Sequence, residues 1–136
     1  MGGAMAAHLV RAGYDVTVTN RTPARAEPLL QMGASWAETP AAAATGAEVA
    51  FTCVSDSPDV EQVLFGADGA AGALAPGAVL VDCSTISPTV TRDIAARLAT
   101  RGVGAVDAPV SGGSEGAQRG TLTAFVGGAA EHVASA

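Results

Sequence analysis

The sequence predicts an α/β fold, a doubly wound and mainly parallel sheet with helices on both faces. Three observations support it: apolar runs of strand length alternate with helix-length segments, glycine, proline, serine or threonine separates them, and polar clusters follow several of the apolar runs. The chain has 136 residues, of which 49% are hydrophobic, so it can bury a core of its own. We therefore expect one domain, or a piece of one.

Helices and strands alternate in the first part of the chain. Thr22 and Pro23 suit the N-cap and first turn of a helix, and Gly13 and Gly33 suit helix ends. Pro28 is expected to bend the second helix, because proline removes a backbone hydrogen bond. The predicted elements are a helix over 2–12, a strand over 14–20, a helix from 22 to 32, a short strand over 34–36 and a small helix over 40–45.

The alternation continues through the rest of the chain. Residues 48–54 are strongly apolar, which is typical of a strand buried on both faces of a parallel sheet. Ser87 is in position to cap the helix that follows it. The predicted elements are a strand over 48–54, short helices over 58–65 and 69–74, a strand over 78–83, a helix over 88–101, and strands over 104–108 and 122–126. This order predicts a sheet of the Rossmann type.

Polar clusters follow the predicted strands at their carboxyl ends, where such sheets bind ligands. They are Asn20-Arg21-Thr22, Ser55-Asp56, Ser84-Thr85 and Ser111-Gly112-Gly113. In the last cluster, a serine hydroxyl lies beside two glycines that let backbone N–H groups approach a ligand closely. Taken alone, that triplet is most often only a turn. As a site, it would suit a carboxylate or a phosphate.

Charge and composition narrow the function. The net charge of -6 argues against a nucleic-acid or membrane surface, and no run of 18 apolar residues or signal-peptide pattern is present. We therefore expect a cytoplasmic protein. Cys53 and Cys83 lack metal or redox spacing, and we expect free buried thiols and no metal site. All seven basic residues are arginines, so the chain contains no lysine to act as a general acid or base.

The segment 107–128 resembles the substrate loop of the β-hydroxyacid dehydrogenases, which include 3-hydroxyisobutyrate dehydrogenase and tartronate semialdehyde reductase. It reads Asp-Ala-Pro-Val-Ser-Gly-Gly and continues with Gly-Thr-Leu and Val-Gly-Gly. The resemblance implies that Ser111, Gly112 and Gly113 bind the substrate carboxylate. Residues 1–6 are similar to the end of the family's Gly-Leu-Gly-x-Met-Gly pattern, which implies a cofactor site at Met1 and Gly2.

On this reading, residues 1–136 are an NAD(P)-binding domain of the 6-phosphogluconate dehydrogenase type that is incomplete at both ends. The family's first strand and the first two glycines of its cofactor turn would lie before Met1 and are missing here. The C-terminal helical domain is also absent. The first strand usually lies in the middle of the sheet, so both of its neighbours should be left with unpaired backbone groups. We expect weak cofactor binding and no activity from these residues alone.

Further cofactor contacts follow from the polar clusters. A neutral residue followed by arginine at the end of the second strand accommodates a 2′-phosphate, which favours NADP over NAD. The residues concerned are Asn20, Arg21 and Thr22. By resemblance, Thr85 contacts the nicotinamide ribose, and the loop containing Val54, Ser55 and Asp59 contacts the cofactor, although relatives often have asparagine in place of Asp59.

The resemblance implies hydride transfer between a nicotinamide cofactor and a short 3-hydroxy acid or semialdehyde, by a full-length protein that is a homo-oligomer. No catalytic residue is assigned, because the family lysine is absent from the chain. His8 and His132 are not expected to replace it, and Asp82 and Asp107 are expected to make structural hydrogen bonds. Two alternatives stay open: a relative of the imine reductases, and a non-catalytic cofactor-binding or interaction module. A 6-phosphogluconate dehydrogenase fits less well, because residues 121–123 match the small-acid branch.

Overall fold

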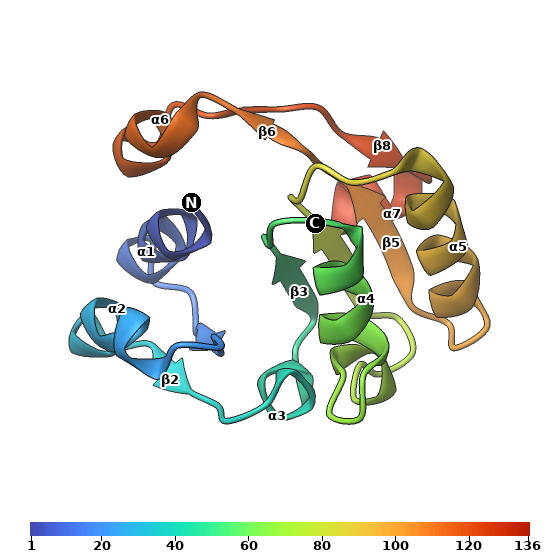
Figure 1. The fold of residues 1–136 in the computed structure, drawn as a ribbon, viewed down its shortest axis with the longest axis horizontal. Helices are drawn as coiled ribbons and strands as arrows, with labels where there is room; N and C mark the ends of the chain where they lie inside the picture. The colour runs from blue at the N-terminus through green and yellow to red at the C-terminus, as the bar shows by residue number, and fades with distance from the viewer.

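The computed structural model describes residues 1–136 and has a four-stranded sheet with helices on both sides (Figure 1). The order is β3-β4-β5-β8, in which the first three strands are parallel and β8 is antiparallel to β5. The strands are β3 (Val49–Thr52), β4 (Val79–Asp82), β5 (Gly104–Asp107) and β8 (Gly127–Gly128). The mainly parallel α/β architecture predicted from the alternation is confirmed.

The remaining strands form two small sheets. A parallel pair joins β1 (Thr17–Val18) to β2 (Ser35–Trp36), and an antiparallel pair joins β6 (Val110–Ser111) to β7 (Thr123–Ala124). The helices are α1 (Gly2–Arg11), α2 (Glu27–Gln31), α3 (Pro40–Ala44), α4 (Ser57–Phe65), α5 (Pro88–Ala99), α6 (Gly113–Arg119) and α7 (Ala130–Ser135), with short 3-10 turns η1 (Pro23–Arg25) and η2 (Ala70–Gly72).

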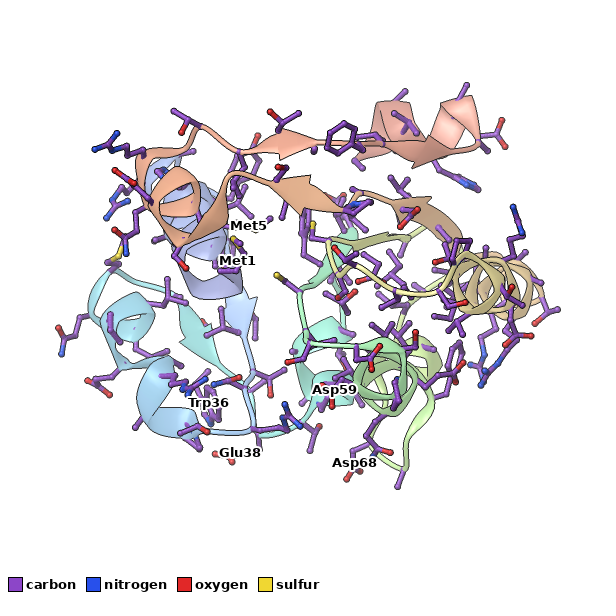
Figure 2. The ribbon with its side chains drawn as sticks, turned by 45° about the horizontal axis from the view of Figure 1, so that its top comes forward. Met1, Met5, Trp36, Glu38, Asp59 and Asp68 are labelled. Carbon is purple, nitrogen blue, oxygen red and sulfur yellow. The ribbon has the colours of Figure 1, made fainter.

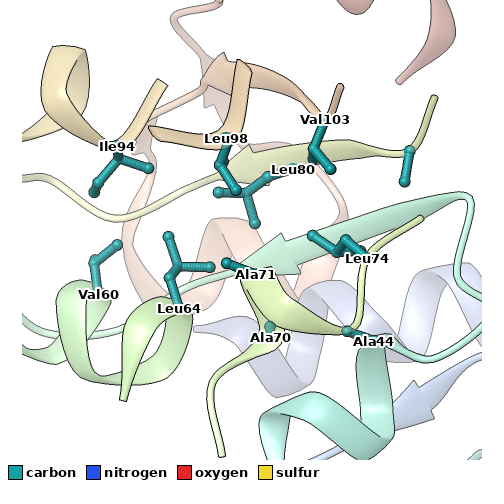
Figure 3. Close-up of a cluster of buried hydrophobic side chains, with 11 residues drawn as sticks. Ala44, Val60, Leu64, Ala70, Ala71, Leu74, Leu80, Ile94, Leu98 and Val103 are labelled. Atoms are coloured by element: carbon teal, nitrogen blue, oxygen red, sulfur yellow. The ribbon is translucent and has the colours of Figure 1, made fainter. Parts of the chain in front are cut away.

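The main core lies between one face of the sheet and helices α4 and α5 (Figure 3). Leu80 of β4 packs there against Val60 and Leu64 of α4 and against Leu98 of α5, and none of these side chains is more than 1% exposed. Each such side chain stabilises the fold by about 1.5–3 kcal/mol through burial alone. This packing fixes β3, β4 and β5 relative to one another, and with them the loops at their carboxyl ends.

The opposite face of the sheet is only partly covered. A second cluster contains Val79, Val81 and Val106, with Met5 of α1 packed against it. An apolar hollow of about 270 Å³ remains on this face, and all of its lining residues are hydrophobic. Phe51 of β3 lies on its rim and is 49% exposed.

The expectation that residues 48–54 form a strand buried on both faces is therefore wrong. β3 is an end strand, with β4 as its only neighbour. The carbonyls of Glu48 and Thr52 accept hydrogen bonds from β4, so the alternating residues Val49 and Phe51 direct their backbone groups to the free edge. β1 is likewise an end strand of its own pair.

Several helix boundaries differ from those predicted. The helix expected over 22–32 is split into η1 and α2, and Pro28 lies in the first turn of α2 instead of bending a longer helix. A first-turn proline costs no hydrogen bond, so starting a new helix there is favourable. Ser87 occupies the N-cap position of α5, but its side chain makes no capping hydrogen bond. Helices α6 and α7 were not predicted.

Candidate functional site

The polar clusters at 55–56 and 84–85 follow the parallel strands β3 and β4, and the cluster at 20–22 follows β1 of the small parallel pair. The predicted cluster Ser111-Gly112-Gly113 lies instead at the end of the antiparallel strand β6. The register pairs Thr52 with Asp82 and Asp82 with Asp107, so the last residues of β3, β4 and β5 stand side by side. Residues 53–56, 83–87 and 108–112 follow these strands directly. Their loops therefore leave the sheet at one edge.

A buried hydrogen-bond network joins two of these loops. The Thr52 hydroxyl donates to Oδ1 of Asp82 at 2.8 Å, and the Ser84 amide donates to the same oxygen at 3.0 Å. The Val54 amide in turn donates to Oγ of Ser84 at 3.0 Å. The other oxygen of Asp82, Oδ2, is buried without a partner. The structural role expected for Asp82 is confirmed, since its carboxylate holds the β3 and β4 loops together.

Asp107 extends this acidic end of the sheet. Burial, and then the charge of Asp82, raise the pKa of the Asp107 carboxyl above its ordinary value of 3.8. The charge of Asp82 on the neighbouring strand thus opposes the ionisation of Asp107 at the edge from which the loops leave.

The Ser111-Gly112-Gly113 segment joins β6 to α6. Ser111 ends β6, where it pairs with Thr123 of β7, and Gly112 is the N-cap of α6. Gly112 and Gly113 have φ values of +132° and +64°, which side chains rarely adopt. A Cβ atom at Gly112 would also lie 3.1 Å from Cδ2 of Leu122. The backbone here requires glycine, and it presents the exposed Ser111 beside a helix start.

The helix after this segment was missed from the sequence, although signals for it exist. Arg119 and Glu115 form an ion pair one turn apart at 2.7 Å, and Gly120 ends the helix with a φ of +70°. The helix is hard to predict because two glycines stand at its start, and glycine normally disfavours helices.

His8 was also missed as a connecting residue. Its Nε2 lies 3.0 Å from the carbonyl of Ala117 and 3.1 Å from that of Gln118, so it donates to the last turn of α6. The Ala117 carbonyl also accepts from the Gly120 amide, at the longer distance of 3.4 Å, so a further donor at this helix end is favourable. His8 thereby ties α1, which carries the residues Met1 to Ala6, to the helix that follows Ser111.

The start of α1 packs closely against the end of β3. A Cβ atom on Gly2 would lie 3.2 Å from Cβ of Cys53, whereas one on Gly3 would meet no atom within 4 Å. The carbonyl of Met1 accepts from the amides of Ala4 and Met5, which opens the helix. A side chain at Gly2 would therefore be accommodated only if Cys53 moved by a few tenths of an ångström. Figure 2 labels Met1 and Met5 on this helix.

Both cysteines are free, as expected. Burial raises the pKa of the Cys53 thiol, and burial together with the nearby Cys53 raises that of Cys83 to about 11. Neither thiol is ionised enough near neutrality to act as a nucleophile.

The structure brings Arg21 and Asp59 together. Nη1 of Arg21, in the loop after β1, lies 3.2 Å from Oδ1 of Asp59 in the first turn of α4. Asn20 donates from Nδ2 to the Thr22 carbonyl at 3.0 Å, and Thr22 is the N-cap of η1 without a side-chain capping bond. Ser55 and Thr85 lie exposed on their loops. The predicted cofactor residues thus lie at the start of α1, in the loops after β1, β3 and β4, and in the first turn of α4. An ion pair joins the loop after β1 to α4.

No helix of the structure combines the length and the apolar character needed to cross a membrane.

A family model described as the NAD binding domain of 6-phosphogluconate dehydrogenase matches residues 1–136. An uncharacterized oxidoreductase of Shewanella frigidimarina is 46% identical over 97% of this chain and 46% of its own length. The 3-hydroxyisobutyrate dehydrogenase of Pseudomonas aeruginosa is 41% identical over 100% of this chain and 46% of its own length. The chain thus spans about half the length of the curated relatives it matches.

Solved structures agree with these matches. The 3-hydroxyisobutyrate dehydrogenase of Salmonella typhimurium is 31% identical, with a TM-score of 0.92 over 98% of this chain and 47% of that one. That of Mycobacterium tuberculosis, solved with L-serine, is 32% identical, with a TM-score of 0.91 over 98% and 45%. An imine reductase of Myxococcus stipitatus, in complex with NADP+, is 28% identical, with a TM-score of 0.75 over 82% and 38%. The chain belongs to the family of NAD-binding domains of the 6-phosphogluconate dehydrogenase type, within the NAD(P)-dependent β-hydroxyacid dehydrogenases.

Proposed function

We propose that the complete protein is an NADP-dependent oxidoreductase that transfers a hydride between the nicotinamide and a short 3-hydroxy acid of the 3-hydroxyisobutyrate or tartronate semialdehyde type. The observation that carries this proposal is the Ser111-Gly112-Gly113 segment, whose two positive-φ glycines expose a hydroxyl and a helix start at the end of β6. Relatives of the whole chain that are named 3-hydroxyisobutyrate dehydrogenase support it.

The residues present fit a dinucleotide cofactor. The absence of a side chain at Gly2 lets the start of α1 lie close to Cys53. A helix start offers backbone N–H donors suited to a pyrophosphate group. Arg21 is an exposed cation at the end of β1, suited to a 2′-phosphate. In the proposal, Met1 and Gly2 face the pyrophosphate, Asn20, Arg21 and Thr22 the adenosine ribose, Val54 and Ser55 the middle of the cofactor, and Thr85 the nicotinamide ribose. NAD would bind the same loops without the phosphate contact.

These residues define what the protein contributes to the reaction and what the cofactor contributes. The bound cofactor supplies the hydride acceptor or donor, so the protein must orient the substrate and exchange one proton. Ser111 donates its hydroxyl to the substrate carboxylate, and the amides at Gly112 and Gly113 add donors. The substrate hydroxyl exchanges its proton with a lysine that residues 1–136 do not contain. His8 cannot take this role, since its Nε2 is committed to the carbonyls of α6.

Steady-state kinetics of the protein produced from its complete reading frame tests the proposal. Ser111→Ala should raise the KM for 3-hydroxyisobutyrate by about tenfold or more and leave the KM for NADP within about twofold, because one charge-assisted hydrogen bond is lost. Ser114→Ala is the matched control, since Ser114 lies exposed in the first turn of α6. An unchanged substrate KM in Ser111→Ala would overturn the carboxylate assignment.

Imine reduction is a second candidate, favoured by the likeness to imine reductases. Its proton donor would differ from the family lysine, so turnover of a cyclic imine with NADPH, and none of 3-hydroxyisobutyrate, would establish it. Cofactor binding without turnover of either substrate would instead indicate a non-catalytic module.

We also propose that the complete protein is a cytoplasmic homo-oligomer. The family resemblance supports the homo-oligomer, and the net charge of -6, which argues against a membrane surface, supports the location. Cell fractionation and light scattering of the purified protein test the two statements separately.

A further inference from the structure

The Arg21–Asp59 ion pair connects the small parallel pair β1-β2 to the main four-stranded sheet. Arg21 follows β1, which belongs to the small parallel pair, and Asp59 lies on α4, which packs on the main sheet. The contact joins Nη1 to Oδ1 at 3.2 Å. In Figure 2, Asp59 lies at the side of α4 that faces the part of the chain containing Trp36. The pair therefore spans the loops between which the adenosine end of the cofactor is proposed to lie.

The two partners differ in how firmly they are held. The Arg21 side chain is 78% exposed, whereas that of Asp59 is 28% exposed. Asp59 stands in the first turn of a nine-residue helix, where the helix dipole favours a carboxylate, and Asp56 already caps that helix through the Ser57 amide at 2.7 Å. Asp59 thus keeps its place without Arg21, while only one nitrogen of the guanidinium is engaged.

From this geometry we propose that Asp59 sets the cofactor preference by competing with a 2′-phosphate for Arg21. The inference rests on the proposed function. A 2′-phosphate is a dianion that binds arginine through the guanidinium N–H donors, and Nη1, one of the nitrogens that carry them, now faces Asp59. To bind there, it must displace the carboxylate or accept a like charge close by, and either event weakens binding of NADP without affecting NAD. Asp59 therefore reduces the preference for NADP over NAD that Arg21 creates.

The substitution Asp59→Asn removes the competing charge and keeps the shape of the side chain. Asparagine also suits a first helical turn, so the fold should be retained. The ratio of NADP to NAD affinity, measured by calorimetry on the protein from its complete reading frame, should rise about threefold to tenfold, the scale of a lost exposed ion pair plus a relieved repulsion. Asp59→Ser should change the ratio in the same direction.

Asp93→Asn is the matched control. Asp93 forms a pair of the same length, 3.2 Å, with Arg97 on the exposed side of α5. The same loss of charge there should alter the cofactor ratio less than twofold. In an Arg21→Ala background, Asp59→Asn should raise the ratio less than it does when Arg21 is present, because the competition for Arg21 is removed and only the repulsion between carboxylate and phosphate is relieved.

The possible results separate this inference from the proposed function. A ratio that stays constant or falls in Asp59→Asn, with both cofactors still binding, overturns the competition and leaves the proposed function standing. A fall would mean that Asp59 holds Arg21 ready for the phosphate. Failure of the unsubstituted protein to bind either cofactor overturns both.

Discussion

Substituting Gly112 by alanine tests whether the backbone of the proposed carboxylate site depends on glycine. With φ at +132° and ψ at -1°, Gly112 lies outside the regions open to other residues, and holding alanine there costs about 1–3 kcal/mol. The new Cβ atom would lie 3.1 Å from Cδ2 of Leu122, but this is the end of a flexible side chain and can move aside at little further cost. Most of the loss should therefore come from backbone strain.

Urea denaturation followed by circular dichroism measures this loss. Gly112→Ala should lower the free energy of unfolding by about 1–3 kcal/mol, and it should also raise the substrate KM if the backbone relaxes. Gly3→Ala is the control, because Gly3 lies in α1 with no atom within 4 Å of the new Cβ, and alanine should stabilise the helix by up to about 1 kcal/mol. If Gly112→Ala were as stable as the unsubstituted protein, the argument that alanine strains the backbone at this position would be refuted.

Three further substitutions test the hydrogen-bond network of Asp82, the raised pKa of Asp107 and the hydrogen bond from His8 to α6. Thr52→Val should cost about 1.5–3 kcal/mol of unfolding free energy, since Asp82 loses a buried donor at 2.8 Å; a loss below about 0.5 kcal/mol in urea would contradict this. Because the pKa of Asp107 is raised in the folded protein, the protonated carboxyl favours folding. The stability that it contributes is present below about pH 4 and is lost as pH rises through the raised pKa. Asp107→Asn should therefore gain stability relative to the unsubstituted protein between about pH 4 and pH 7, and a pH-independent difference in urea midpoints would refute it. His8→Leu should speed amide hydrogen exchange in α6 by about tenfold, because it removes the donor to the last turn; unchanged exchange would show that the bond does not hold the helix.

The order of elements and the edge that carries the site could be predicted from sequence. Residues 78–83 are buried throughout, and residues 104–108 are buried at alternate positions. A parallel sheet brings the ends of these two runs together. The register places the last residues of these strands, Asp82 and Asp107, side by side, and the binding roles of the polar residues beyond them stay a prediction. The resemblance gave the family, which the matches bear out.

Other features depend on long-range contacts that no local pattern encodes. The exposure of Phe51 follows from the absence of a strand beside β3, while its apolar sequence alone suggests full burial. His8 meets the carbonyl of Ala117, and Arg21 meets Asp59, only because the fold brings distant segments together. The position of Pro28 was misread for a different reason, since a proline within a helical pattern can equally begin a new helix.

A crystal structure of the protein from its complete reading frame, with NADP+ and 3-hydroxyisobutyrate bound, tests the central claim most directly. We predict that the substrate carboxylate accepts hydrogen bonds from the Ser111 hydroxyl and the neighbouring glycine amides, with the cofactor lying along the loops after β1, β3 and β4. A carboxylate bound away from Ser111, with those amides facing solvent, would contradict the account.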